Sequence, residues 1–213
     1  MLTNYECEVA TTLVEALVEY GLTKNLAQYG EHGTQDWFWY SELGKHGFWA
    51  SSGASKVCIG HEDLEGWIVK VGYTEKVACD YATLEYNIYC LAEEAGLAHY
   101  FPKTIYLGEF DGRAFYVQEY ADCDEDTVSS DWYERLRDEY DESGEDYDSD
   151  TLWEVIDAME ADEKAYLCFH DRALCEFLIE NRVGDLHEGN FGYIGGCLVI
   201  VDFSGWRGQN EEF

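Results

Sequence analysis

Two aspartates and an asparagine stand near the end of this chain, at spacings that suit phosphoryl-transfer chemistry. Asp185 and Asn190 belong to the run DLHEGN, and Asp202 follows the apolar run CLVIV. An apolar strand that ends in Asp202, beside a loop with Asp185 and Asn190, presents a cluster of oxygen ligands for a hard cation such as magnesium. Such a cation keeps phosphate oxygens in its other positions, which leaves Asp185 to act as a base or to position a hydroxyl. The competing interpretation is an acidic turn that closes a β-hairpin.

The elements that precede these residues follow a clear order. Apolar residues at helical spacing predict a helix over residues 3–20. From Trp49 the pattern changes to three strands, the last being Trp67 to Val71, and a helix that ends at Gly96 follows. Two further strands are joined by Asp111-Gly112, which is the best hairpin signal in the sequence.

A strongly acidic segment comes next. Residues 122–163 contain 19 acidic side chains, against two arginines and no lysine. Aromatic and aliphatic residues still recur in this segment, which predicts two acidic helices around a loose loop at ESGEDYDSD. The second helix is expected to continue as one long periodic run to about Asn181.

The whole chain is acidic: 45 Asp and Glu side chains against 13 Lys and Arg give a formal net charge of −32. Such a chain is repelled by nucleic acid and by anionic membranes, and it is attracted to basic protein surfaces. Two interpretations stay open, a highly soluble or salt-adapted surface and a partner surface that imitates nucleic acid. The eight cysteines form no CxxC pair, and no signal peptide or membrane-spanning run is seen. The sequence therefore predicts a soluble cytoplasmic protein with reduced thiols.

The run DLHEGN followed by VDFSG resembles the catalytic and metal-binding loops of the protein-kinase-like fold, especially its aminoglycoside-phosphotransferase and atypical-kinase branches. The resemblance implies Asp185 as the catalytic base, Asn190 as a metal ligand and Asp202 as the main magnesium ligand. With its IKVG-like strand, the chain looks most like the small early protein kinases of T7-like bacteriophages.

The resemblance also implies roles for residues earlier in the chain. Lys70, on the third strand, corresponds to the lysine that this fold requires, and Glu85 on the next helix is its candidate partner. The residues expected to bind the ATP cofactor lie on the loop after the first strand, on the lysine strand and at the hinge between lobes: Ser52, Gly53, Ala54, Lys70, Glu119 and Ala121. Two alternatives stay open: Lys70 as an edge residue of a sheet, and the loop as an ordinary hairpin turn.

The predicted fold class is α+β, a two-lobed protein-kinase-like fold with a truncated C-terminal lobe. Residues 1–47 would form an N-terminal helical extension, and residues 48–121 a small lobe with a five-stranded antiparallel sheet and one helix. Residues 122–213 would form the truncated helical large lobe, with an acidic insert at 122–150 and the catalytic and metal loops at 183–206.

Three departures from the family pattern bear on the large lobe. Val183 stands where the family often has His, and Ser204 where many kinases have Gly. Because eleven residues follow Asp202, an activation segment and the later helices of the lobe are not expected. The acidic insert then becomes the candidate for holding a basic substrate.

The function that the resemblance implies is that of an ATP- and Mg2+-dependent protein serine/threonine kinase. It would be phage-encoded and act on host proteins of transcription and RNA processing, and such kinases are linked to host transcription shutoff. The partner would be a host protein with a basic surface, without direct binding to nucleic acid or membrane. Two alternatives remain, an acidic kinase-like scaffold that inhibits a basic or nucleic-acid-binding host protein, and a small-molecule phosphotransferase.

Overall fold

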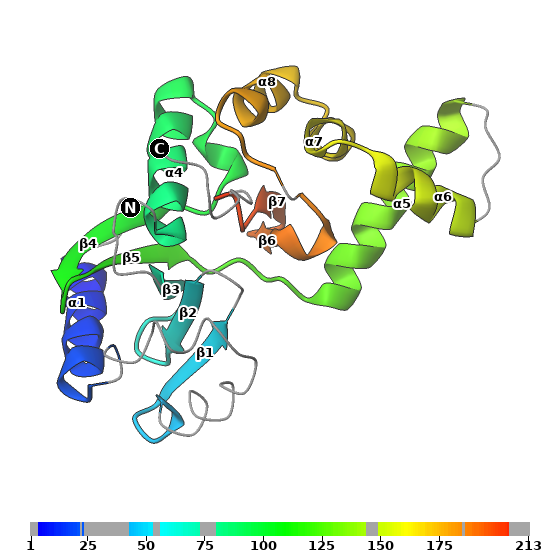
Figure 1. Ribbon diagram of the computed structural model, residues 1–213. Helices are drawn as coiled ribbons and strands as arrows, with labels where there is room; N and C mark the ends of the chain where they lie inside the picture. Colours follow the sequence, from blue (N-terminus) through cyan, green and yellow to red (C-terminus); the bar gives the residue numbers. More distant parts are fainter. Residues whose placement is uncertain are drawn as a thin grey trace. The chain divides into compact units, whose positions relative to one another are not determined.

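The computed structural model describes residues 4–21, 23, 43–52, 56–72, 80–143, 149–184 and 186–204. The chain is of mixed α+β class and divides into two compact units. One unit contains Met1–Leu91 and Pro102–Tyr120 and is called the sheet unit here; the other contains Ala92–Phe101 and Ala121–Glu212 and is called the helical unit. Figure 1 shows the elements of both units along the chain.

The sheet unit contains a five-stranded antiparallel sheet, as the sequence predicted, and its strand order is β1-β2-β3-β5-β4. Its strands are β1 (Phe48–Ser52), β2 (Lys56–His61), β3 (Trp67–Gly72), β4 (Thr104–Phe110) and β5 (Arg113–Glu119). The predicted hairpin turn joins β4 to β5. Asp111 and Gly112 have φ values of 52° and 73°, the left-handed conformation that a type I′ turn requires at both central positions.

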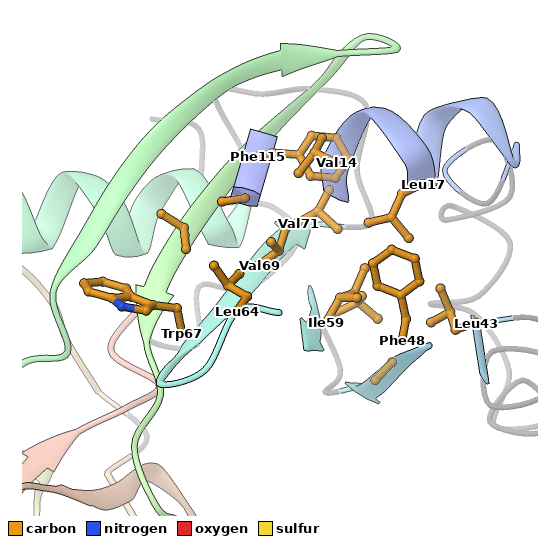
Figure 2. Close-up of a cluster of buried hydrophobic side chains, with 14 residues drawn as sticks. Val14, Leu17, Leu43, Phe48, Ile59, Leu64, Trp67, Val69, Val71 and Phe115 are labelled. Carbon is orange, nitrogen blue, oxygen red and sulfur yellow. The ribbon is translucent and has the colours of Figure 1, made fainter. Parts of the chain in front are cut away.

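One face of this sheet is apolar, because alternate residues of each strand point to the same side. The register pairs Ala50 with Ile59, Val57 with Val71 and Val69 with Val117, so these side chains share that face. Helix α1 (Asn4–Glu19) packs against it through Ala10, Val14 and Leu17. Figure 2 shows Val14 and Leu17 close to buried side chains of the strands, including Phe115 and Val71.

The opposite face, called the polar face here, contains charged and amide side chains among apolar ones. Its members follow from the same register: Trp49, Lys56, Cys58, Gly60, Ile68, Lys70, Gly72, Tyr116 and Gln118. Helix α4 (Tyr81–Ala95) packs against this face, with Ala82 and Tyr86 on Ala114 and Tyr116. Because α4 covers the polar face, it can bring its own side chains to the lysines of the sheet.

The helical unit contains four α-helices in its described part, with two short 3-10 helices and a β-hairpin. Its elements are η2 (Ala98–Tyr100), α5 (Glu125–Ser143), α6 (Ser149–Ala158), α7 (Ala161–Phe169), α8 (Arg172–Glu180), η3 (Glu188–Asn190), β6 (Phe191–Ile194) and β7 (Cys197–Ile200). Helix α5 buries Val128, Trp132 and Leu136, which recur every four residues, while its acidic side chains lie mainly on the exposed side. None of the helices described in either unit is long and apolar enough to cross a membrane.

The prediction of one long helix up to Asn181 is wrong, because this stretch forms three helices. The Glu160 N–H donates to Glu163 Oε2 at 3.1 Å, which is half of a capping box at the start of α7. His170 ends α7 in the left-handed conformation, with φ 51°. Asp171 then caps α8, since its Oδ1 accepts hydrogen bonds from Ala173 N and Leu174 N at 2.8 and 3.3 Å.

Candidate functional site

The centre of the candidate site in the sheet unit is an ion pair between β3 and α4. Lys70 Nζ donates to Glu85 Oε1 at 2.8 Å, and the two side chains are 5% and 1% exposed. Lys70 lies on the polar face, and Glu85 is in the second turn of the helix that covers this face. The contact expected between Lys70 and Glu85 is therefore present, and the alternative of a solvent-exposed edge lysine does not fit a residue buried to this degree.

A second lysine contacts the same carboxylate. Lys56 Nζ lies 3.4 Å from Glu85 Oε2, and its side chain is 5% exposed. Oε2 accepts no hydrogen bond from the described residues, so the ammonium of Lys56 compensates it as an ion pair and not through a well-formed hydrogen bond. Gln118 Nε2 completes the contacts of Glu85 by donating to Oε1 at 3.3 Å, and it also donates to Thr104 Oγ1 at 2.8 Å.

A buried aspartate lies beside this pair at the start of α4. Asp80 is 2% exposed, and burial raises its pKa to about 6. Two contacts lower the pKa of Asp80 against this effect of burial. One is the hydrogen bond from the Ala82 N–H to Asp80 Oδ1 at 3.3 Å, and the other is the charge of Lys56. A Cβ on Gly72 would overlap the carboxylate of Asp80, so this approach requires glycine. Arg113, also buried, donates to the Gly72 carbonyl at 3.2 Å.

These five buried charged residues are called the charge cluster here: Lys56, Lys70, Asp80, Glu85 and Arg113. Sequence reasoning found Lys70 and Glu85 but missed Lys56, Asp80 and Arg113. The available signal for Lys56 was its even spacing from Cys58 and Gly60, which places it on the same face as Lys70 once the register is set.

An aromatic pair lies on the same polar face at the β1 edge. The ring of Trp49 covers Gly60, where a Cβ would overlap the indole. Its centroid is 6.0 Å from that of Tyr120, and the rings meet edge to face at 83°. Trp49 on β1 is 44% exposed, and Tyr120, which follows the end of β5, is 48% exposed, so both side chains are partly accessible to solvent. Sequence reasoning did not single out this pair.

In the helical unit, the β6–β7 hairpin brings Asn190 and Asp202 together. Its ladder ends with Phe191 opposite Ile200, and the Val201 N–H donates to the Asn190 carbonyl at 2.9 Å. Asn190 and Asp202 therefore lie at neighbouring positions on the two chains that leave the hairpin. Asn190 is 8% exposed, and Ser204 Oγ donates to Asp202 Oδ1 at 3.2 Å.

The loop before this hairpin is held by local hydrogen bonds. His187 Nδ1 accepts from the Gly189 N–H at 3.1 Å and thereby caps the short helix η3, which ends at Asn190. This contact is consistent with a structural role for the histidine. Asp185, the predicted base, lies outside the described residues, as do Gly53 and Ala54 of the predicted phosphate loop; Ser52 ends β1, and its side chain also lies outside them.

The two predicted hinge residues have different surroundings. The Glu119 N–H donates to the Lys103 carbonyl at 2.9 Å and the Tyr120 N–H to the Gly66 carbonyl at 2.9 Å, so these two donors already have partners. Ala121 is buried and belongs to the helical unit. A role of Glu119 in holding a base would therefore use its carbonyl oxygen, and the roles of both residues stay predictions.

The donor sets of the two units suit different kinds of ligand. The amide of Asn190 and the carboxylate of Asp202 are oxygen donors of the kind that magnesium prefers. The ammonium groups of Lys56 and Lys70 suit phosphate oxygens. No group of three or more His, Cys, Asp or Glu side chains that could hold a metal ion occurs among the described residues, so a metal here would need phosphate or water ligands as well.

Comparisons with protein-family models, with curated proteins and with solved structures found no significant match to this chain.

Proposed function

We propose that the chain is an ATP- and magnesium-dependent protein serine/threonine kinase with a two-lobed, protein-kinase-like fold and a truncated C-terminal lobe. The observation that carries this proposal is the buried ion pair between Lys70 on the third strand and Glu85 on the following helix. In protein kinases a lysine at this place contacts the nucleotide phosphates and pairs with a glutamate of the next helix. Asn190 and Asp202, which lie close to each other within the helical unit, also support the proposal.

Each residue then has a defined task in phosphoryl transfer. Lys70 binds phosphate oxygens of the nucleotide, and Glu85 holds its ammonium in place. Asn190 and Asp202 would hold the magnesium ion, which supplies charge neutralisation at the phosphates when it is bound. Asp185 accepts the proton of the substrate hydroxyl. As it does so, the hydroxyl oxygen forms the new bond to the γ-phosphorus, and the bond from that phosphorus to the leaving ADP oxygen breaks.

The resemblance to early kinases of T7-like phages extends the proposal to a phage-encoded enzyme that phosphorylates host proteins of transcription and RNA processing. The exposed acidic side chains of α5 support a substrate with a basic surface, among them Asp126, Glu134, Asp138, Asp141 and Glu142. Complementary charge of this kind raises association rates and selects among partners.

The test is transfer of radiolabel from ATP to host proteins by the purified chain in the presence of magnesium. Asp202→Ala and Lys70→Ala should each reduce incorporation at least about a hundredfold, because Lys70 would neutralise phosphate charge directly and Asp202 would hold the magnesium ion that does so. Glu180→Ala removes an exposed carboxylate of α8, away from the acidic side of α5, and should retain wild-type transfer. Transfer to small alcohols alone, or no transfer by the folded wild type, would contradict the proposal.

The exposed acidic side of α5 also favours a second candidate, a scaffold that binds and blocks a basic host protein without catalysis. The same variants separate the two functions. If inhibition of host growth persists in Asp202→Ala and in Asp185→Ala, and the complex with the host protein dissociates at moderate salt, the scaffold is the function.

A further inference from the structure

The buried amide of Gln118 connects the ion pair of Lys70 and Glu85 to the edge strand β4. Gln118 lies on β5, opposite Ile68 of β3 and Thr104 of β4, and it is 1% exposed. Its Nε2 donates to Glu85 Oε1 at 3.3 Å and to Thr104 Oγ1 at 2.8 Å. Burial of an amide costs free energy that burial of an apolar side chain does not, so a glutamine at this place requires an explanation of its own.

The hydrogen bonds of Gln118 run in a fixed direction. The Thr104 hydroxyl donates to the Pro102 carbonyl at 3.1 Å, so its oxygen is left to accept from Gln118. The carboxylate of Glu85 is an acceptor as well, and an amide nitrogen offers two N–H groups. Both N–H groups of Gln118 therefore go to acceptors, and the amide is held in the orientation that turns its nitrogen toward Glu85.

This orientation fixes one oxygen of Glu85. Oε1 accepts from Gln118 and also from Lys70, whose Nζ lies at 2.8 Å. Oε2 accepts no hydrogen bond from the described residues, and its contact with Lys56 is an ion pair at 3.4 Å. Gln118 is the uncharged donor on Oε1, so it holds the carboxylate in place and leaves the negative charge of Glu85 to the lysines.

We propose that Gln118 is a positioning residue of the nucleotide site, which acts through Glu85 on the ammonium of Lys70 and is itself oriented by Thr104. This inference rests on the proposed function, since Lys70 has a phosphate to meet only if the chain binds a nucleotide. It differs from a structural role, in which the hydrogen bonds of Gln118 do no more than join β4, β5 and α4.

The test is steady-state phosphoryl transfer by the full chain with ATP varied, each rate divided by the concentration of folded protein. Gln118→Met keeps the length of the side chain and removes both donors. It should lower kcat about tenfold and change the KM for ATP less than about threefold, because a misplaced ammonium still attracts bound phosphates but no longer meets the charge that develops during transfer.

Thr104 supplies a second arm of the test, because it reaches Glu85 only by way of Gln118. Thr104→Val removes the acceptor that orients the amide and should lower kcat about threefold, whereas Thr104→Ser keeps the hydroxyl and should retain wild-type kcat. The double variant with Gln118→Met should be no slower than Gln118→Met alone, since the two residues act in series.

Tyr116→Phe is the matched control. Tyr116 lies on the same strand and the same face as Gln118, is 2% exposed, and also joins β5 to α4, through a hydrogen bond of 2.7 Å between its hydroxyl and that of Thr83. Loss of this contact should lower stability but leave kcat and the KM for ATP as in the wild type.

The outcomes separate this inference from the proposed function. If the wild type transfers phosphate and Lys70→Ala does not, while Gln118→Met keeps wild-type kcat, the proposed function stands and the role of Gln118 is wrong. An equal loss of kcat in Tyr116→Phe would also overturn that role, because the loss would then come from weaker packing of β5 on α4. If Gln118→Met does not fold, equal kcat values for Thr104→Val and Thr104→Ser would overturn it instead. If the folded wild type transfers no phosphate, the proposed function fails and this inference fails with it.

Discussion

Replacement of Asp80 by asparagine is expected to stabilise the protein more at neutral pH than near pH 5. Burial raises the pKa of Asp80 from 3.8 to about 6, so the folded state favours the protonated carboxyl. The stabilisation that protonation provides is complete below pH 3.8 and is lost as the pH rises through about 6. Asparagine is uncharged at every pH and keeps an oxygen that can accept the Ala82 N–H.

The size of the effect follows from the two pKa values. The difference between 3.8 and about 6 corresponds to about 3 kcal/mol, at about 1.36 kcal/mol per pKa unit. The folded state holds the Asp80 proton to a higher pH than the unfolded state does. Of the stabilisation that this proton provides, about 1.4 kcal/mol is lost between pH 5 and pH 7.5. That interval also stays above the isoelectric point of about 4.2, where loss of net charge promotes association. The stability of Asp80→Asn relative to wild type should therefore rise by about 1.4 kcal/mol across this interval.

The assay is urea unfolding followed by tryptophan fluorescence at half-unit pH steps, with the free energy of unfolding taken from linear extrapolation. Glu94→Gln removes an exposed carboxyl from the same helix and should show no pH-dependent difference from wild type beyond about 0.3 kcal/mol. A difference between Asp80→Asn and wild type that stays constant from pH 5 to 7.5, or that falls as pH rises, would refute the reasoning.

Two further substitutions test the packing of the charge cluster. Gly72→Ala should destabilise the fold by about 3 kcal/mol or more, because the added Cβ would overlap the Asp80 carboxylate. Gly44→Ala, where the added Cβ meets open space, should be nearly neutral. Thermal unfolding followed by circular dichroism measures both. Glu85→Gln should lower the free energy of unfolding by about 3–5 kcal/mol, because it removes the counter-charge that the two buried lysines share. A loss below about 1 kcal/mol in urea unfolding would contradict that role of Glu85.

The sheet could be predicted from the sequence because its signals are local. Alternating apolar residues mark each strand, and Asp111-Gly112 fixes the turn between β4 and β5. Lys56 could not be assigned in the same way, since its contact with Glu85 joins β2 to α4 and depends on which face the side chain occupies. That face is known only when the strand register is known.

In the helical unit, the ends of the helices were harder to predict than the helices themselves. The run from α6 to α8 keeps apolar residues at helical spacing through its breaks, and neither Gly nor Pro marks them. The break after α7 instead uses His170 in the left-handed conformation, a conformation that is uncommon outside glycine. Asp171 was the one available sign, because Asp is a favoured N-cap residue.

The last motif was predicted with two competing interpretations, a metal site and an acidic turn that closes a β-hairpin. The structure contains a hairpin, but the turn that closes it is Gly195-Gly196, and the acidic run DLHEGN precedes its first strand. An acidic turn therefore does not close this hairpin, and the metal site stays a prediction.

The β6–β7 hairpin determines where Asn190 and Asp202 lie relative to each other along the chain. The pairing places Asn190 opposite Val201, one position before Asp202, and this offset depends on the register of β6 with β7 and not on the length of the Gly195-Gly196 turn. The hairpin also closes over a short stretch of chain, and hairpins of this kind form within microseconds. Residues inserted in that turn should therefore leave Asn190 and Asp202 where they are, whereas a slip in the register would move one past the other.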